Sequence, residues 1–381
     1  MFAYLWLLAL PVLLALGRRA GPRRERWALL LTWIALTLFV GLRRNVGGDW
    51  GNYLLMHARA GSHPLFDAIM LGDPVYMLIS GLLFRFGFAL VAVNLVCAAI
   101  FAGGLVLFVR VQPRPALALI IAFPVLIAVA AFATRQSAAI GLLLAALAML
   151  SAGRTRLAAS LVLLAPGFHW TAILLLPLLP ATLIRAWPPR LTIAAGAAAG
   201  LGLAALLALT PMGERFDNVG ASAGAPLRAG FFLLTLIVLA VRWHRLGLGE
   251  REFSAGAFLA ALGLFALALT PVLSTAGDRI GYYAVPLQMM VLPRAALSLS
   301  SPALQRTAQW AIAILYAGIF AAWLALSPYH TCLVPYRTYL VDPAAIRILD
   351  PEQHRRSSPC GAGPRQLRMQ SRSNASAAPA G

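Results

Sequence analysis

The sequence contains no lysine, and it has only 12 acidic residues and three cysteines in a chain of 381 residues. Charged residues make up 11% of the chain, whereas they make up about a quarter of a typical soluble domain. Hydrophobic residues account for 61%, so the composition excludes a soluble globular enzyme as well as a disordered or collagen-like chain. The three cysteines, Cys97, Cys332 and Cys360, lack the spacing of a metal site, and we predict no metal.

Arginine supplies every basic side chain, and the formal net charge is +19. A guanidinium binds phosphate and carboxylate groups well because its planar fork matches them. Arginines in the short loops of membrane proteins also fix the orientation of the spans, which is the simpler reading for most of them. They are spread over short loops and form no basic module, which argues against nucleic acid as a partner.

Long apolar stretches predict an all-α fold, a polytopic bundle of transmembrane helices. One crossing takes about 20 apolar residues, so about 12 spans (range about 10–13) use about 240 residues and leave no room for a second folded domain. We expect one transmembrane domain over residues 1–340, with a retained first span, and a disordered Arg/Ser/Ala/Pro-rich tail over 341–381. The apolar stretches lie at 2–16, 27–42, 88–109, 116–133, 137–150, 157–167, 170–184, 191–209, 229–241, 254–273, 280–293 and 308–326.

Clusters of arginine predict which loops face the cytoplasm. They lie at 18–26, 110–114, 154–156, 185–190 and 242–251, and the positive-inside rule places such loops on the cytoplasmic side. This choice puts both termini outside and requires the short apolar segment near 74–86 to be an interfacial or re-entrant helix. The region 157–184 is predicted to form either two short helices or one kinked span, and its flanking arginines favour a hairpin from the cytoplasmic side.

An outer loop at residues 43–53 has the composition of a binding loop. It contains Arg43 and Arg44, a Gly-Gly turn, the carboxylate of Asp49, and the aromatic side chains of Trp50 and Tyr53. The arginines are candidates to clamp an anion, and either aromatic ring is a candidate to stack on a sugar. The alternative is an ordinary interfacial loop whose arginines and aromatics lie at the level of the lipid headgroups.

Three further polar sites stand beside apolar stretches on the same predicted face. Arg135 is bracketed by two spans, which makes it a functional candidate, although it could also extend to a lipid phosphate. His169 lies at a break between two short apolar helices and is a candidate general base; the alternative is a packing histidine. Arg279 follows Asp278 at the entry of a span, where an internal ion pair is the alternative to a binding role.

Taken in order, these motifs resemble those of EpsG-like proteins, which are bacterial membrane glycan polymerases similar in role to the Wzy-type O-antigen polymerases. The resemblance covers roughly residues 30–340, and order and spacing carry it because each motif is short. One departure is Gly48, where the family often has Thr before the aspartate. The matching segments are Arg43–Tyr53, Arg135-Gln136, Phe168-His169, Arg279-x-x-Tyr282 and Pro335-Tyr336-Arg337.

The resemblance implies a polymerase of the bacterial inner membrane that joins polyprenyl-pyrophosphate-linked oligosaccharide units on the periplasmic face. The product would be an exopolysaccharide, a capsule or an O-antigen. It implies no cofactor, since the pyrophosphate is already a good leaving group. The expected partners are the lipid-linked oligosaccharide, the lipid bilayer, and a chain-length regulator and a flippase of the same pathway.

For such a reaction we expect His169 or Asp49 to take the proton of the acceptor hydroxyl, and Arg135 and Arg279 to hold the pyrophosphate. The remaining candidates would bind substrate; they are Arg43, Arg44, Trp50, Tyr53, Tyr282 and Arg337.

Two other classes of protein remain open at this point. A lipid-linked glycan flippase or other transporter would show repeat symmetry between its halves and polar residues near the middle of the bilayer, and the sequence shows no such repeat. Another polyprenyl-dependent glycosyltransferase or ligase would often carry a large outer loop or an early acidic pair. A structural membrane subunit is the residual possibility.

Overall fold

The computed structural model describes residues 3–9, 22–184, 188–209, 224–327 and 330–341. Within these residues the fold is entirely helical, and the only extended pairing is an isolated antiparallel bridge between Arg43 and Thr338. The main rods are α2 (Pro22–Gly41), α6 (Leu90–Arg110), α7 to α8 (Pro115–Phe132, with the π-helical turn η1 at Phe123–Ile127), α9 (Thr134–Ser151), α12 (Pro189–Leu209), α14 (Ala225–Arg242), α15 (Glu250–Leu269), α17 (Val285–Leu297) and α18 (Pro302–Leu326).

Six helical segments in the described part of the chain are long and apolar enough to cross a membrane. A polytopic helical bundle is therefore consistent with the structure, but the predicted count of about 12 spans is not confirmed. Several of the other apolar stretches form helices that are too short for a crossing, and α2 begins in a charged segment. Residues 3–9 of the predicted first span at 2–16 are described and are helical, and the rest of that span lies outside the described residues, as does the predicted tail at 341–381 apart from residue 341. The six segments are Leu90–Arg110, Pro115–Phe132, Thr134–Ser151, Ala225–Arg245, Glu250–Leu269 and Pro302–Leu326.

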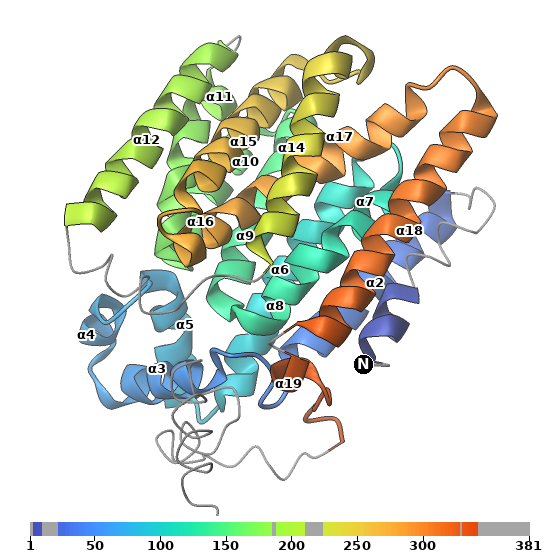
Figure 1. The fold of residues 1–381 in the computed structure, drawn as a ribbon. Coiled ribbons are helices and arrows are strands. Elements are labelled where there is room, and N and C mark those ends of the chain that lie inside the picture. Colours follow the sequence, from blue (N-terminus) through green and yellow to red (C-terminus); the bar gives the residue numbers. More distant parts are fainter. Residues whose placement is uncertain (1–2, 10–21, 185–187, 210–223, 328–329, 342–381) are drawn as a thin grey trace, which may run out of the picture.

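Successive long helices run in alternating directions, so the segments that connect them lie at the two ends of the bundle (Figure 1). The arginine-bearing connections at 110–114, 154–156 and 242–251 lie toward the upper end in this view. The short helices α3, α4, α5 and α19 lie at the lower end. The polar loop at 43–53 and the break at His169 also belong to the lower end, away from these arginine clusters.

Helices α6 and α9 pack closely against each other at two glycines near the centre of the fold. A Cβ atom on Gly104 would lie 1.8 Å from the carbonyl oxygen of Gly141, and one on Gly141 would lie 2.5 Å from the Cα atom of Phe101. Both obstacles are backbone atoms, which cannot move without separating the helices. Small residues at such crossings let membrane helices approach closely and gain van der Waals contact.

Replacing Gly141 by alanine should therefore destabilise the bundle by about 1–3 kcal/mol, the usual range for overpacking a close-packed core. The matched control is Gly103→Ala on α6, where the nearest atom to a new Cβ is Nε1 of Trp33 at 3.5 Å. The measurement is the thermal midpoint of each detergent-solubilised variant, followed by size-exclusion chromatography. Equal midpoints for the two variants would contradict this description of the crossing.

Three short helices form a platform at the lower end: α3 (Trp50–Ser62), α4 (Leu65–Met70) and α5 (Pro74–Arg85). The predicted short helix near 74–86 is present as α5, and its 12 residues are too few for a crossing. Its position relative to the lipid headgroups remains a prediction.

The region 157–184 forms two short helices rather than one span. The first is α10 (Thr155–Leu164), extended by the 3-10 turn η2 (Ala165–Gly167). The second is η3 (Trp170–Leu178), continued by α11 (Leu179–Leu183), and it packs back against α10 as a hairpin. The hairpin turn lies against α5, because Gly167 has no side chain to keep Val75 away: a Cβ there would lie 2.4 Å from Cγ2 of Val75. This contact brings His169 to the platform.

The described chain ends by folding back on the loop that follows α2. After α19 (His330–Leu333), the carbonyl of Arg337 accepts a hydrogen bond from the backbone N–H of Arg44 at 2.9 Å. The backbone N–H of Tyr339 donates to the carbonyl of Leu42, also at 2.9 Å. The first and last predicted motifs are thus neighbours in the fold.

Candidate functional site

One buried carboxylate, Asp73, joins the beginnings of three helices at the lower end. It stands immediately before α5 and is 5% exposed. Its Oδ2 accepts a hydrogen bond from Nη1 of Arg135, at the start of α9, at 2.5 Å. Its Oδ1 accepts another from the backbone N–H of Trp170, the first residue of η3, at 2.9 Å. Asp73 therefore fixes Arg135 relative to the turn that carries His169.

His169 has an extended backbone, with φ −153° and ψ 120°, between the two helices of the hairpin. Its side chain is 5% exposed, and Nδ1 has no hydrogen-bond partner within the described residues. Burial lowers the pKa of His169 well below its ordinary value, and the positive charges of Arg135 and Arg279 lower it further. These effects favour the neutral imidazole, and its buried Nδ1 is a polar atom without a protein partner among the described residues.

Arg135 is the central charge of the site. Its guanidinium lies over the rings of Tyr53 and Tyr76, with the central carbon 5.8 and 5.9 Å from their centroids. The Nε atom of Arg135 is buried and has no hydrogen-bond partner among the residues that the structure describes. The carboxylate of Asp49 is close enough to act electrostatically on Arg135. One ion pair and two aromatic faces thus hold this guanidinium in place.

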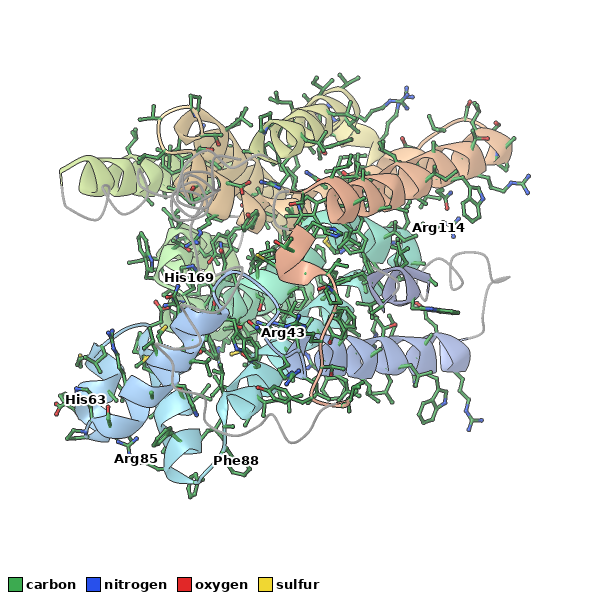
Figure 2. The ribbon with its side chains drawn as sticks, turned by 60° about the horizontal axis from the view of Figure 1, so that its bottom comes forward. Arg43, His63, Arg85, Phe88, Arg114 and His169 are labelled. Atoms are coloured by element: carbon green, nitrogen blue, oxygen red, sulfur yellow. The ribbon has the colours of Figure 1, made fainter. Side chains whose placement is uncertain are left out.

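Arg279 reaches the same site from α16 (Ser274–Gly281). Its backbone carbonyl accepts a hydrogen bond from Nε2 of Gln136 at 2.7 Å, which ties α16 to the start of α9. The side chain is partly exposed, and its charge acts on His169. Three further predicted residues therefore lie within electrostatic reach of Arg135 or His169: Asp49 and Tyr53 act on Arg135, and Arg279 acts on His169. Seen from the lower end, His169 lies to the left of Arg43 (Figure 2).

Arg43 is close to this site but buried rather than open to a ligand. It is 1% exposed, and its Nη1 donates to the carbonyl of Val40 at 2.5 Å. Its Nη2 donates to Oγ1 of Thr134, the residue before Arg135, also at 2.5 Å. Through this hydrogen bond to Thr134, Arg43 stabilises the beginning of α9. A direct contact of Arg43 with substrate remains a prediction.

Other predicted binding residues of the 43–53 loop and the C-terminal motif form a neighbouring layer. Trp50 is 3% exposed and packs against Tyr339, with ring centroids 6.4 Å apart. Arg44 is partly exposed and Arg337 is exposed, and a backbone hydrogen bond holds the two residues side by side. Contact of Arg44 and Arg337 with substrate remains a prediction.

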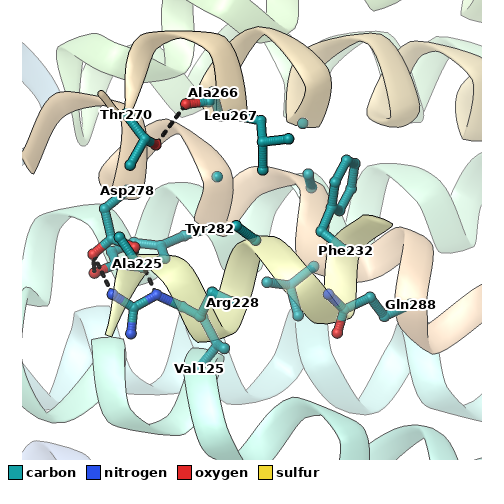
Figure 3. A pocket seen from close by; sticks show the side chains of 16 residues that line it. Val125, Ala225, Arg228, Phe232, Ala266, Leu267, Thr270, Asp278, Tyr282 and Gln288 are labelled. Carbon is teal, nitrogen blue, oxygen red and sulfur yellow. Dashed lines mark hydrogen bonds and ion pairs between the residues drawn. The ribbon is translucent and has the colours of Figure 1, made fainter. Parts of the chain in front are cut away.

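Tyr282 points to a different place from Arg279. Its hydroxyl donates to Oδ2 of Asp278 at 2.7 Å. Asp278 is paired with Arg228 of α14 rather than with the adjacent Arg279, through contacts of 2.6 and 2.7 Å. Asp278 is therefore paired away from Arg279, whose charge acts on His169, and Figure 3 shows its pair with Arg228. The ring of Tyr282 lies against Arg228 of α14, with the guanidinium carbon 5.8 Å from the ring centroid.

Sequence reasoning missed Asp73. The available signal was an aspartate directly before Pro74 at the start of a predicted short helix, where a carboxylate is a favoured cap. Its side chain instead bonds to Arg135 and Trp170, and that long-range pairing is not encoded in local sequence. Within the described residues, no group of three or more His, Cys, Asp or Glu side chains is placed to hold a metal ion.

The family model described as the EpsG family matches residues 26–338, which includes the site and all six membrane-spanning candidates. No curated protein and no solved structure matches the chain.

Proposed function

Because the chain belongs to the EpsG family of membrane proteins of polysaccharide biosynthesis, we propose that it is a glycan polymerase of the bacterial inner membrane. It joins polyprenyl-pyrophosphate-linked oligosaccharide repeat units on the periplasmic face. The polymer is an exopolysaccharide, a capsule or an O-antigen. A chain-length regulator and a flippase of the same pathway act beside it.

The reaction is a glycosyl transfer between two lipid-linked units. A hydroxyl oxygen of the acceptor sugar forms a bond to the anomeric carbon of the donor. The bond between that carbon and the pyrophosphate oxygen breaks, and polyprenyl pyrophosphate leaves with the electron pair. The proton of the hydroxyl passes to a base in the site, and no redox step or nucleotide is needed.

The observation that carries this proposal is a buried histidine on which the charges of two arginines act. Arg135 and Arg279 supply positive charge at the site. In the proposed reaction this charge stabilises the negative charge that develops on the leaving pyrophosphate, and such electrostatic stabilisation is usually the largest single contribution to catalysis. Nδ1 of His169, which is buried and has no hydrogen-bond partner among the described residues, is the candidate acceptor of the hydroxyl proton. Asp49 lies beside Arg135 and is the second candidate for the base.

The distribution of arginine supports the periplasmic location of the site. The arginine-bearing connections at 110–114, 154–156 and 242–251 lie at the end opposite the platform and His169 (Figures 1 and 2). The positive-inside rule puts those connections in the cytoplasm. The site then faces the compartment in which repeat units are polymerised.

Deleting the gene for this chain tests the proposal in cells. We expect lipid-linked single repeat units to accumulate on the periplasmic face and long polymer to be absent, because units are exported but not joined. The measurement is mass spectrometry of lipid-linked glycans, with the accessibility of the units to an enzyme added to spheroplasts. The control is the same strain with the intact chain restored.

Two other results would each give a different assignment. Single units held on the cytoplasmic face would indicate a flippase. Long polymer at the normal level would exclude this chain as the polymerase of that glycan.

A further inference from the structure

Thr134 is the first residue of α9 and stands immediately before Arg135, but it is itself buried, with 1% of its surface exposed. It follows a break between α8 and α9, where Ala133 has φ −120° and ψ 82°. Ala133 has no polar side chain to cap the helix, so other groups must fix the first turn of α9 relative to the bundle. The hydroxyl of Thr134 makes two contacts that do so.

Two buried side chains from different elements hold this hydroxyl. Nη2 of Arg43, in the loop after α2, donates a hydrogen bond to Oγ1 of Thr134 at 2.5 Å. Oγ1 of Thr134 in turn donates to Oδ1 of Asn94, on α6, at 3.3 Å. A hydroxyl group has one proton to donate and also accepts hydrogen bonds, so these two bonds together fix its direction. The start of α9 is thereby tied to α6 and to the loop.

Asn94 is a polar residue inside a membrane-spanning candidate, Leu90–Arg110, and it is 0% exposed. Its Nδ2 atom has no hydrogen-bond partner among the described residues. A polar side chain at this depth is costly, and in membrane proteins such residues bond across helices or serve a function. The bond to Thr134 gives the amide of Asn94 a role at the start of α9.

Arg43 bridges the end of α2 and the start of α9. Its Nη1 donates to the carbonyl of Val40 on α2, and its Nη2 donates to Thr134. Hydrogen bonds from a charged donor are stronger than neutral ones. A buried donor that loses its acceptor pays the cost of its own desolvation. The guanidinium of Arg43 and the hydroxyl of Thr134 therefore hold each other in place.

The next residue along the chain is Arg135. Asp73 and the ring of Tyr53 hold the far end of its side chain, whereas the contacts of Thr134 hold the backbone at its base. The position of the guanidinium depends on both ends. A displacement of about 1 Å in a reacting site can lower a rate about 10²-fold.

We propose that Thr134 is a positioning residue for the reaction: its hydroxyl, held by Arg43 and Asn94, fixes the backbone from which the guanidinium of Arg135 extends. The assignment rests on the proposed function. It gives Arg43 and Asn94 a role that needs no contact with substrate, because both act through Thr134.

Replacing Thr134 by valine tests the proposal, because it removes the hydroxyl and keeps the shape of the side chain. In reconstituted full-length protein supplied with lipid-linked units, we expect kcat to fall about 10- to 100-fold. KM should change less than about threefold, the pattern of a group that acts in the transition state. Thr134→Ser keeps the hydroxyl and should restore most of the rate.

The matched control is Thr32→Val on α2. Thr32 is also buried, but its hydroxyl bonds to the carbonyl of Ala28 in its own helix at 2.8 Å. This variant should keep the wild-type kcat per folded molecule.

Chemical modification of Arg135 by phenylglyoxal, mapped by mass spectrometry, reports on its position without polymerisation. The side chain of Arg135 is 27% exposed, so the reagent can reach it. We expect faster modification of Arg135 in Thr134→Val than in the wild-type chain, in Thr134→Ser or in Thr32→Val.

A folded Thr134→Val variant with the wild-type kcat and the wild-type rate of modification would overturn the proposal. Equal losses of kcat in Thr134→Ser and Thr134→Val would also overturn it, because the hydroxyl would then not be the group that matters. If Thr134→Val does not fold, Asn94→Leu removes a partner of the hydroxyl and should give the same two results. Faster modification of Arg135 in a chain that forms no polymer would keep the positioning of Arg135 by Thr134 and reject the polymerase.

Discussion

Replacing Arg135 by alanine is expected to reduce polymer formation at least about 10²- to 10³-fold, the typical cost of removing one preorganised group that stabilises developing negative charge. The guanidinium is held in place by Asp73 and by the rings of Tyr53 and Tyr76. It acts on the leaving pyrophosphate, so the loss should appear in the rate of transfer. The measurement is the rate of chain elongation by purified protein with lipid-linked units.

The same substitution also has a structural effect that must be separated from the catalytic one. Removing Arg135 leaves Asp73 buried and unpaired, since the Asp73 side chain is 4% exposed. Such a change usually destabilises a protein by about 3–5 kcal/mol. The double variant Asp73→Asn/Arg135→Ala removes the unpaired charge and should recover thermal stability without recovering activity. Recovery of both in the double variant would show that Arg135 acts only through the fold.

The second large effect is expected at His169. Replacing His169 by glutamine should lower the rate of transfer about 10²- to 10⁴-fold, the usual contribution of a general base, while the affinity for the lipid-linked donor changes little. The matched control is His57→Gln. His57 is also buried, but its ring bonds to Oγ of Ser80 and to the carbonyl of Phe88, at 2.8 and 3.0 Å. The control variant should lose stability and keep its rate per folded molecule. Equal rates per folded molecule for the two variants would contradict a chemical role for His169.

The pH dependence of stability gives His169 an independent signature. Its pKa is lowered in the folded protein by burial and by two arginines, whereas an unfolded histidine has a pKa of about 6.5. The unfolded state therefore binds the proton more tightly, and the contribution of His169 to stability is present above about pH 6.5 and lost as the pH falls below it. His169→Gln should reduce this acid sensitivity of the thermal midpoint, whereas an unchanged profile would argue against the buried neutral imidazole.

Local sequence signals predicted the parts of the site that depend on breaks in the helices. The Pro166-Gly167 pair indicated the helix break at which His169 lies, and Arg135 stood out because two apolar stretches bracket it. Asp73 could not be assigned in the same way. Its partners are 62 and 97 residues away along the chain, and only the packing of α5 against the hairpin brings them together.

Burial is the property that the sequence described least well. Arg43 lies in a polar, glycine-rich loop, which is typical of an exposed binding segment. In the structure the C-terminal segment pairs with this loop, and Arg43 turns inward to Val40 and Thr134. Apolar length was also an incomplete guide to spans, because the hairpin at 155–183 divides into two helices that are each too short to cross alone.

The most direct test of the central claim is to supply the purified, membrane-reconstituted chain with polyprenyl-pyrophosphate-linked repeat units and nothing else. The account predicts oligomers of two or more repeats, with one polyprenyl pyrophosphate released for each new linkage. It also predicts that the double variant Asp73→Asn/Arg135→Ala, although folded, forms these oligomers far more slowly than the wild-type chain. Unchanged single units after incubation with the folded wild-type chain would contradict the assignment of this site to glycan polymerisation.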